Sequence, residues 1–245
     1  MNHQQRNYII FGASGGIGSA TATELVHAGG RVLLAGRNET SLQALAEQLQ
    51  QPYYLVDATD VQAVQDCVQQ AQQDFGDIHG VVNCVGSILL KPVHLLTEAQ
   101  WQTTLQLNLT SAFAVVRAAC TAMLKTGGHI VLLSTAACCH LGLPNHEAIA
   151  AAKAGVIGLM QSTAATYAKH HIRVNCIAPG LIESPLSAFI TQNPKALAIS
   201  LKHHPLGRIG TPHDISRGIV FLLDRDADWI TGQVLAIDGG LSVIK

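Results

Sequence analysis

Residues 8–18 read Tyr8-Ile9-Ile10-Phe11-Gly12-Ala13-Ser14-Gly15-Gly16-Ile17-Gly18, an apolar run that stops at a cluster of glycines. Glycines at positions 12, 16 and 18 give the pattern G-x-x-x-G-x-G. Such a tight turn between a strand and a helix lets the backbone approach a pyrophosphate, and the helix N-terminus attracts the anion. A glycine cluster alone is also typical of a structural turn. Its place after a predicted strand and before a predicted helix favours nucleotide binding.

Six further apolar runs follow, at residues 31–35, 53–56, 80–85, 129–133, 172–177 and 233–237. Continuous runs of this length are typical of strands that are buried on both faces. The segments between them show helical spacing, for example Leu42, Leu45 and Leu49, and Asp60 and Thr97 are candidate N-caps. The pattern predicts one Rossmann-like α/β domain over residues 1–245, a doubly wound parallel sheet of about seven strands with helices on both faces.

The composition excludes several classes of protein. The chain has 245 residues, of which 48% are hydrophobic and 13% charged, and its formal net charge is -1. High hydrophobicity excludes a disordered chain, and the lack of a basic excess argues against nucleic-acid binding by phosphate neutralisation. No apolar stretch approaches the roughly 18 residues of a membrane span, and no export signal precedes the first strand. Six cysteines without a C-x-x-C pair then favour reduced thiols in the cytoplasm.

Two regions carry predictions about ligands. The second strand ends at Gly36-Arg37, which offers a guanidinium and no carboxylate. An arginine there suits a 2′-phosphate, so NADP(H) is favoured over NAD(H), although a solvated arginine would look the same. Residues 181–211 contain Pro185, Pro194 and Pro205 and form the least regular stretch, a candidate substrate lid. Its many apolar residues suggest an apolar ligand, and core packing would explain them as well.

Several later motifs match one family. Asp57-Ala58 follows the third strand, Asn83-Cys84-Val85-Gly86 follows the fourth, and Asn108 lies in a helical segment. Pro179-Gly180 follows the sixth strand, and residues 205–210 and 230–240 complete the pattern. Over nearly its whole length the chain resembles the short-chain dehydrogenase/reductase family, especially members that reduce 3-oxoacyl-carrier proteins. The resemblance implies a cofactor site made of Gly12, Ser14, Gly15, Gly16, Ile17, Gly18, Arg37, Asp57, Ala58, Asn83, Gly86, Lys153, Pro179, Gly180 and Ile182.

The catalytic residues that this resemblance implies are only partly present. In the family a tyrosine moves the proton, a lysine one helical turn later tunes it, a serine binds the substrate oxygen, and an asparagine orders a water relay. Lys153 and Asn108 match the lysine and the asparagine, but Ile149 stands where the tyrosine is expected. Counting from Gly128 places Thr135 at the serine position, and Ser134 just before it remains an alternative.

His146 is a candidate replacement for the tyrosine. It lies three residues before Ile149 and seven before Lys153, so on one continuous helix the three would share a face. The rise of about 1.5 Å per residue would place it about 4.5 Å from Ile149 along the axis. An imidazole can act as a general acid without help from a lysine. A histidine at a helix start that faces solvent or substrate is the alternative.

No metal site is predicted. Cys138-Cys139-His140 lacks the ligand spacing of zinc sites, and no second cluster completes it. Of the twelve histidines in the chain, His170-His171, His203-His204 and His213 are expected on the surface and in loops.

Two functions remain open. The first is an NADP(H)-dependent oxidoreductase that moves hydride between the nicotinamide and a small carbonyl or alcohol substrate. The second is a catalytically impaired, nucleotide-binding homologue that serves as a sensor or subunit partner. The resemblance also implies self-association as a homotetramer or dimer, through long helices and the C-terminal strand, and the helix expected at residues 148–168 is rich in alanine.

Overall fold

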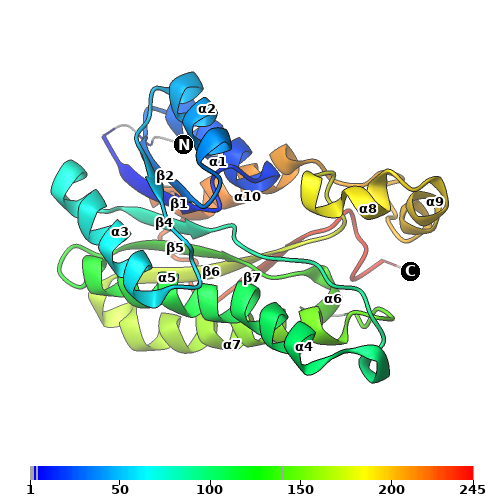
Figure 1. The fold of residues 1–245 in the computed structure, drawn as a ribbon. Helices are drawn as coiled ribbons and strands as arrows, with labels where there is room; N and C mark the ends of the chain where they lie inside the picture. The colour runs from blue at the N-terminus through cyan, green and yellow to red at the C-terminus, as the bar shows by residue number, and fades with distance from the viewer. Residues whose placement is uncertain (1–2, 4, 140, 245) are drawn as a thin grey trace.

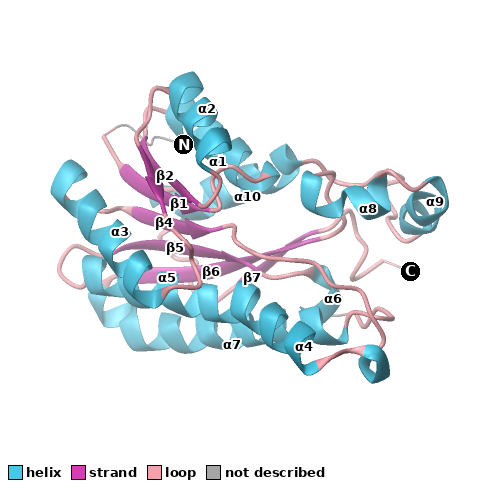
Figure 2. Ribbon diagram, viewed as in Figure 1, coloured by secondary structure: helices cyan, strands magenta, loops and turns pink. Residues whose placement is uncertain are grey.

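A computed structural model describes residues 3, 5–139 and 141–244, and a seven-stranded parallel sheet forms its centre (Figures 1 and 2). The strands are β1 (Asn7–Phe11), β2 (Arg31–Gly36), β3 (Tyr53–Leu55), β4 (Gly80–Asn83), β5 (Gly128–Leu133), β6 (Ile172–Pro179) and β7 (Val234–Ile237). Their order is β3-β2-β1-β4-β5-β6-β7, so the direction of winding reverses between β1 and β4. In open α/β sheets the ligand crevice lies at this switch point, outside the carboxyl ends of the strands. The predicted fold class is confirmed.

Helices cover both faces of the sheet, as Figure 2 shows. One face carries α3 (Val61–Phe75), α4 (Glu98–Leu105), α5 (Ser111–Met123) and α7 (Glu147–Tyr167), and the other carries α1 (Gly16–His27), α2 (Glu39–Leu49) and α10 (Pro212–Leu223). Each layer buries its own apolar core against the strands. Asp60 accepts backbone N–H groups at the start of α3, and Thr97 forms a capping box with Gln100 at the start of α4. Both predicted caps are therefore confirmed.

Shorter helical elements complete the chain. They are η1 (Val93–Leu95), the π-helical turn η2 (Gln106–Thr110), α6 (Ala136–Cys139), η3 (Ala168–His170), η4 (Pro185–Ser187), α8 (Ala188–Thr191), α9 (Pro194–Lys202) and η5 (Arg225–Ala227). The expectation that residues 181–211 are irregular is wrong in part. Asn193 caps α9 with its side chain and Pro194 starts it, so the prolines begin helices here rather than prevent them. In Figure 1 α8 and α9 of this segment project beyond the carboxyl edge of the sheet.

Buried basic side chains occupy the opposite, amino edge of the sheet. Arg6 donates to the carbonyl oxygen of Leu223, and Arg173 donates to those of Leu222 and Asp224. These carbonyls end α10, where cations are favoured by the helix dipole. Burial, together with Arg173 and Arg6, lowers the pKa of the nearby His129 to about 3. This edge is therefore a structural cluster that anchors α10.

One helical segment, Glu147–His170, is long and apolar enough to cross a membrane by length and composition alone. It comprises α7 and η3. The helix packs against β5, β6 and α5 within the core layer. A core helix of this kind passes the same test, so the segment is weak evidence for a membrane span.

Candidate active site

The glycine turn has the close packing that a phosphate cradle requires. Gly12 has a φ of +75°, and a Cβ atom there would lie 3.0 Å from the carbonyl carbon of Cys84. A Cβ on Gly18 would overlap the carbonyl oxygen of Gly12. Both positions therefore require glycine, which brings the start of α1 against the end of β1. Gly15 is the N-cap residue of α1 and has no side chain, so it leaves the space in front of the first helical turn open.

Ser184 and Pro212 pack against this turn. A Cβ on Gly16 would lie 3.3 Å from the Cβ of Ser184 and 3.3 Å from Cγ of Pro212. Ser14 and Ile17, the other side chains of the turn, are half-buried. Ser184 is a candidate ligand contact that the sequence prediction missed. Its only local signal is a polar residue shortly after Pro179-Gly180, and such residues are common in loops.

Arg37 and Asp57 form an ion pair at the ends of neighbouring strands. The guanidinium NH1 lies 3.5 Å from Oδ2 of Asp57, and both side chains are well exposed. The backbone N–H and the hydroxyl of Thr59 hydrogen-bond to the carboxylate at 2.9 and 2.8 Å. Together with Arg37 these bonds hold the pKa of Asp57 below its ordinary value. The adjacent Ala58 is buried. The pair brings together the residues predicted to contact the 2′-phosphate and the adenine.

Asn108 joins two segments near the switch point. Its Oδ1 accepts the backbone N–H of Ser87 at 3.1 Å, and its Nδ2 donates to Oγ of Ser87 and to the carbonyl oxygen of Thr104. It lies in the π-helical turn η2, a distortion often found at functional sites. A Cβ on Gly86 would lie 2.9 Å from Oδ1 of Asn108 and 3.3 Å from Nζ of Lys153. Glycine thus leaves space where the amide and the ammonium converge.

Lys153 is buried in the same place. Its Nζ donates to the carbonyl oxygen of Leu133 at 2.9 Å, at the end of β5. Burial lowers the pKa of its ammonium to about 8, against an opposing contribution from the thiols of Cys176, Cys138 and Cys84. Ile149, one turn earlier on α7, is also buried and offers neither a donor nor an acceptor in its side chain.

Ser134 and Thr135 occupy different environments. Ser134 is buried, and its Oγ donates to the carbonyl oxygen of Lys153 at 3.2 Å and contacts Sγ of Cys138 at 3.3 Å. Thr135 is half-buried, and its Oγ1 accepts the backbone N–H of Ala137. Ser134 therefore belongs to the Lys153 cluster, whereas Thr135 stands at its rim beside α6.

His146 directly precedes α7, and its carbonyl oxygen accepts the backbone N–H of Ala150 in the first hydrogen bond of that helix. That its side chain shares a face with Ile149 and Lys153 stays a prediction. Asn145 adopts the left-handed conformation with a φ of +64°, and α7 begins only at Glu147. His146 is the N-cap residue, and its Nδ1 hydrogen-bonds to the carbonyl oxygen of Pro144 at 2.8 Å. Its side chain is half-buried.

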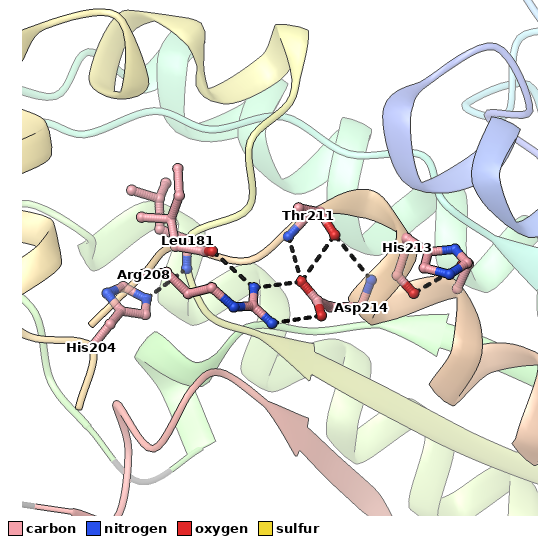
Figure 3. A network of polar contacts seen from close by, with 8 residues as sticks. Leu181, His204, Arg208, Thr211, His213 and Asp214 are labelled. Carbon is pink, nitrogen blue, oxygen red and sulfur yellow. Dashed lines mark hydrogen bonds and ion pairs between the residues drawn. The ribbon is translucent and has the colours of Figure 1, made fainter. Parts of the chain in front are cut away.

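The segment after β6 is fixed from several sides. The N–H of Gly180 donates to the carbonyl oxygen of Ile237, and Ile182 forms an isolated bridge with Gly210. The N–H of Leu181 donates to Nε2 of His204 at 3.2 Å, a contact drawn in Figure 3. His204 is 5% exposed, so the prediction that it lies on the surface is wrong. His203, His171 and His213 are exposed as predicted, and His170 is half-buried.

These residues fit an extended dinucleotide along the carboxyl edge of the sheet. The glycine turn would receive the pyrophosphate, Arg37 and Asp57 lie at one end, and Asn83, Gly86, Asn108 and Lys153 lie at the other. Asn83 is buried, and its Oδ1 accepts the N–H of Val85, which shapes the chain above β4. Of the Cys138-Cys139-His140 segment, His140 and the side chain of Cys139 lie outside the described residues.

Comparisons with known proteins cover almost the entire chain. A family model described as enoyl-(acyl carrier protein) reductase matches residues 12–242. The chain is similar to the 3-oxoacyl-[acyl-carrier-protein] reductase of Thermotoga maritima, with 33% identity over 96% of this chain and 97% of that protein. It is also 30% identical to the cis-4-hydroxycyclohexanecarboxylate dehydrogenase of Sinomonas cyclohexanicum, over 98% of each chain. A solved short-chain type dehydrogenase/reductase from Mycobacterium ulcerans matches with a TM-score of 0.96 and 30% identity, over 100% of this chain and 92% of that one.

Proposed function

The chain belongs to the short-chain dehydrogenase/reductase family, and from this premise we propose an NADP(H)-dependent oxidoreductase that acts on a carbonyl or alcohol group of a small substrate. The nicotinamide, when bound, supplies or accepts the hydride. The observation that carries the proposal is the convergence of Asn108 and Lys153 on the space beside Gly86, next to a close-packed glycine turn. The specificity for NADP(H) rests on Arg37, because no carboxylate follows β2 directly.

The residues of the site then have separate binding roles. The backbone of residues 12–18 holds the pyrophosphate, Arg37 meets the 2′-phosphate, and Asp57 with Ala58 contacts the adenine. Asn83 and Gly86 shape the opening above β4. Lys153 binds the ribose next to the nicotinamide, and Pro179, Gly180 and Ile182 flank the ring. These roles are supported by the positions of the residues along one edge of the sheet.

Proton transfer to the substrate oxygen must proceed without a tyrosine. Ser134 and Thr135 can hydrogen-bond a carbonyl oxygen, and Asn108 can hold a water molecule. The proton then comes from His146 or from water. A His146→Ala variant separates these sources, because only the first requires the imidazole. If His146 is the donor, His146→Ala lowers kcat by about 10²-fold or more.

The lid and the named relatives support an apolar carbonyl substrate. Exposed apolar side chains on the lid include Leu186, Phe189, Ile199 and Leu206. One relative is named for a 3-oxoacyl group on a carrier protein and the other for a hydroxycyclohexane carboxylate. Both names describe an alcohol or ketone on a hydrocarbon framework. We infer an apolar substrate of this kind for the present chain.

Self-association as a homotetramer and a cytoplasmic location complete the proposal. Exposed small residues follow one face of α7, among them Ala151, Ala154 and Gly158, and Phe113 is exposed on the neighbouring α5. A second exposed apolar group surrounds the edge strand β7, and in it Trp229 is 96% exposed. Two such faces on one chain support a tetramer with two kinds of contact.

The test is NADPH oxidation over a panel of ketones and 3-oxoacyl thioesters, measured beside NADPH affinity. Turnover with any member supports the proposal. Tight binding of NADPH without turnover on the whole panel supports a nucleotide-binding homologue that serves as a sensor or subunit partner. That second candidate is favoured by one observation, the buried Ile149 in place of a proton donor.

A further inference from the structure

An imidazole from the lid holds the backbone segment that follows β6. The N–H of Leu181 donates to Nε2 of His204 at 3.2 Å, and Nδ1 of the same ring contacts the carbonyl oxygen of Ser200 at 2.7 Å. In Figure 3 the ring of His204 faces the backbone nitrogen of Leu181. A Cβ on Gly180 would lie only 2.9 Å from Nε2 of His204, so the ring is in direct contact with the chain at this point.

This pair of contacts specifies one protonation state of His204. Ser200 offers a carbonyl oxygen, which can only accept, so Nδ1 carries a proton and donates it. Leu181 offers an N–H group, which can only donate, so Nε2 must be unprotonated and accept. The contacts therefore require the neutral imidazole protonated on Nδ1. When Nε2 takes a proton from solvent, it can no longer accept from Leu181, and two N–H groups face each other.

The groups around the ring offer an alternative partner for a protonated imidazole. His204, Asp238, Arg208 and Asp214 line one cavity of about 170 Å³ with Gly180 and Leu206. Arg208 and Asp214 are already paired through two hydrogen bonds of 2.7 and 2.8 Å, so they largely cancel each other. Lys202 and His203 precede the ring on the chain and are exposed. Asp238 is therefore the anion available to an imidazolium at position 204.

Asp238 is ready to take that role because it is ionised. Its carboxylate oxygens accept the backbone N–H groups of Gly240 and Ser242, each at 2.9 Å. Burial opposes the charge, but hydrogen bonds from Ser242 and Gly240 and the nearby His204 outweigh it, so the pKa of Asp238 lies below its ordinary value. Asp238 and His204 line the same cavity, so a positive charge on His204 would be attracted to the carboxylate of Asp238.

We propose that His204 is a positioning residue: its neutral ring holds Gly180 and Leu181 in place beside the nicotinamide site, and its protonation releases them and weakens dinucleotide binding. The role of this segment beside the nicotinamide rests on the proposed function, whereas the contact between His204 and Leu181 does not depend on it. Histidine is the side chain whose charge ordinarily changes between about pH 5 and pH 8, so the experiments compare pH 8 with pH 5.5.

The first experiment measures the contact without any cofactor. Hydrogen exchange of peptides that contain the Leu181 amide is followed at pH 8 and pH 5.5 and corrected for the intrinsic rates. The wild type should lose protection at Leu181 by about tenfold at pH 5.5, because the amide loses its acceptor. His204→Gln should keep its protection at both values, because Gln offers a carbonyl oxygen and does not titrate. His203→Gln, which changes the exposed neighbour, should behave as the wild type does.

The second experiment measures the dissociation constant of NADPH at the same pH values. The 2′-phosphate itself takes up a proton between these pH values, so every variant should bind NADPH somewhat more weakly at pH 5.5. The wild type and His203→Gln should weaken about tenfold more than His204→Gln does. His204→Leu, which has no acceptor, should bind weakly at both. Protection at Leu181 that is independent of pH in the wild type, or that still changes with pH in His204→Gln, overturns the proposal. Failure of NADPH to bind at any pH contradicts the proposed function instead, and the exchange result still decides the role of His204.

Discussion

Nζ of Lys153 donates a hydrogen bond to the carbonyl oxygen of Leu133 across 2.9 Å, and this bond holds a buried ammonium at the carboxyl end of β5. A lysine whose pKa falls from 10.5 to about 8 on folding disfavours the folded state while it is charged. A shift of this size corresponds to about 3 kcal/mol. The chain therefore maintains at its site a group that lowers its stability, which is typical of residues kept for binding or catalysis.

Replacing this lysine should stabilise the fold. Lys153→Met should raise the free energy of unfolding at pH 7 by about 1–2 kcal/mol, less than the full amount because the carbonyl of Leu133 loses its donor. The gain should shrink as the pH rises from 8 to 10.5, since the folded wild type loses its proton first. Urea unfolding of both proteins at several pH values measures this difference in the free energy of unfolding. Lys169→Met, at an exposed lysine after α7, is the control. A loss of stability at pH 7 in Lys153→Met would contradict the prediction.

Arg37 should determine the preference between the two cofactors. Arg37→Ala should weaken NADPH binding by about tenfold, the value of one charge-assisted hydrogen bond at an exposed position, and leave NADH binding nearly unchanged. Titration with both cofactors gives the two dissociation constants, so NADH serves as the internal control. Equal weakening of both would mean that Arg37 supports the turn and does not read the 2′-phosphate.

His129 at the amino edge of the sheet should make the stability of the fold sensitive to acid. Burial and the neighbouring Arg173 and Arg6 lower the pKa of His129 to about 3, so below pH 6.5 the unfolded chain binds a proton that the folded chain does not. This contribution to stability is present above pH 6.5 and is lost as the pH falls. It amounts to about 1.4 kcal/mol at one pH unit below that value.

The test compares urea midpoints at pH 7.5 and pH 5.5. His129→Gln should lose less stability than the wild type between these values. His94→Gln, at an exposed histidine, should lose as much as the wild type does. A wild-type midpoint that rises toward pH 5.5 would be incompatible with this assignment.

Assembly should depend on the apolar surface beside β7. If the proposed tetramer forms through this surface, Trp229→Glu should convert it to dimers in light scattering, because the charge would be buried at the subunit contact. Phe189→Glu changes a similarly exposed apolar side chain on the lid and should leave the tetramer intact. If Trp229→Glu keeps the mass of the wild type, the contact near β7 is wrongly assigned.

The sheet and the glycine turn could be predicted because their signals are local. Each strand is a continuous apolar run, and the close-packed Gly12 follows the first of them directly. The adjacency of Arg37 and Asp57 also follows in principle, since both come just after strands that pair with each other. Their ion pair depends on side-chain conformations that the sequence does not specify.

The details at His146 and His204 depend on features that the apolar pattern does not predict. Asn145 adopts the left-handed conformation just before His146, and α7 starts at Glu147, which the apolar spacing of the helix does not predict. His203 and His204 are adjacent and chemically identical, but His204 is buried and accepts the N–H of Leu181 after β6, whereas His203 is exposed. The difference in their burial therefore depends on a long-range contact and not on the local sequence.

The measurement that tests the central claim most directly is deuterium transfer from NADPH labelled at the hydride position, read as mass in the product. We compare the wild type, Ile149→Tyr and Ile149→Phe. The wild type should transfer deuterium to the carbinol carbon of an apolar ketone. Ile149→Tyr should transfer it about 10²-fold or more faster by supplying a proton donor one turn before Lys153, and Ile149→Phe, of similar bulk without the hydroxyl, should not. Transfer by Ile149→Tyr but none by the wild type over the whole panel would contradict the claim that this chain is an oxidoreductase.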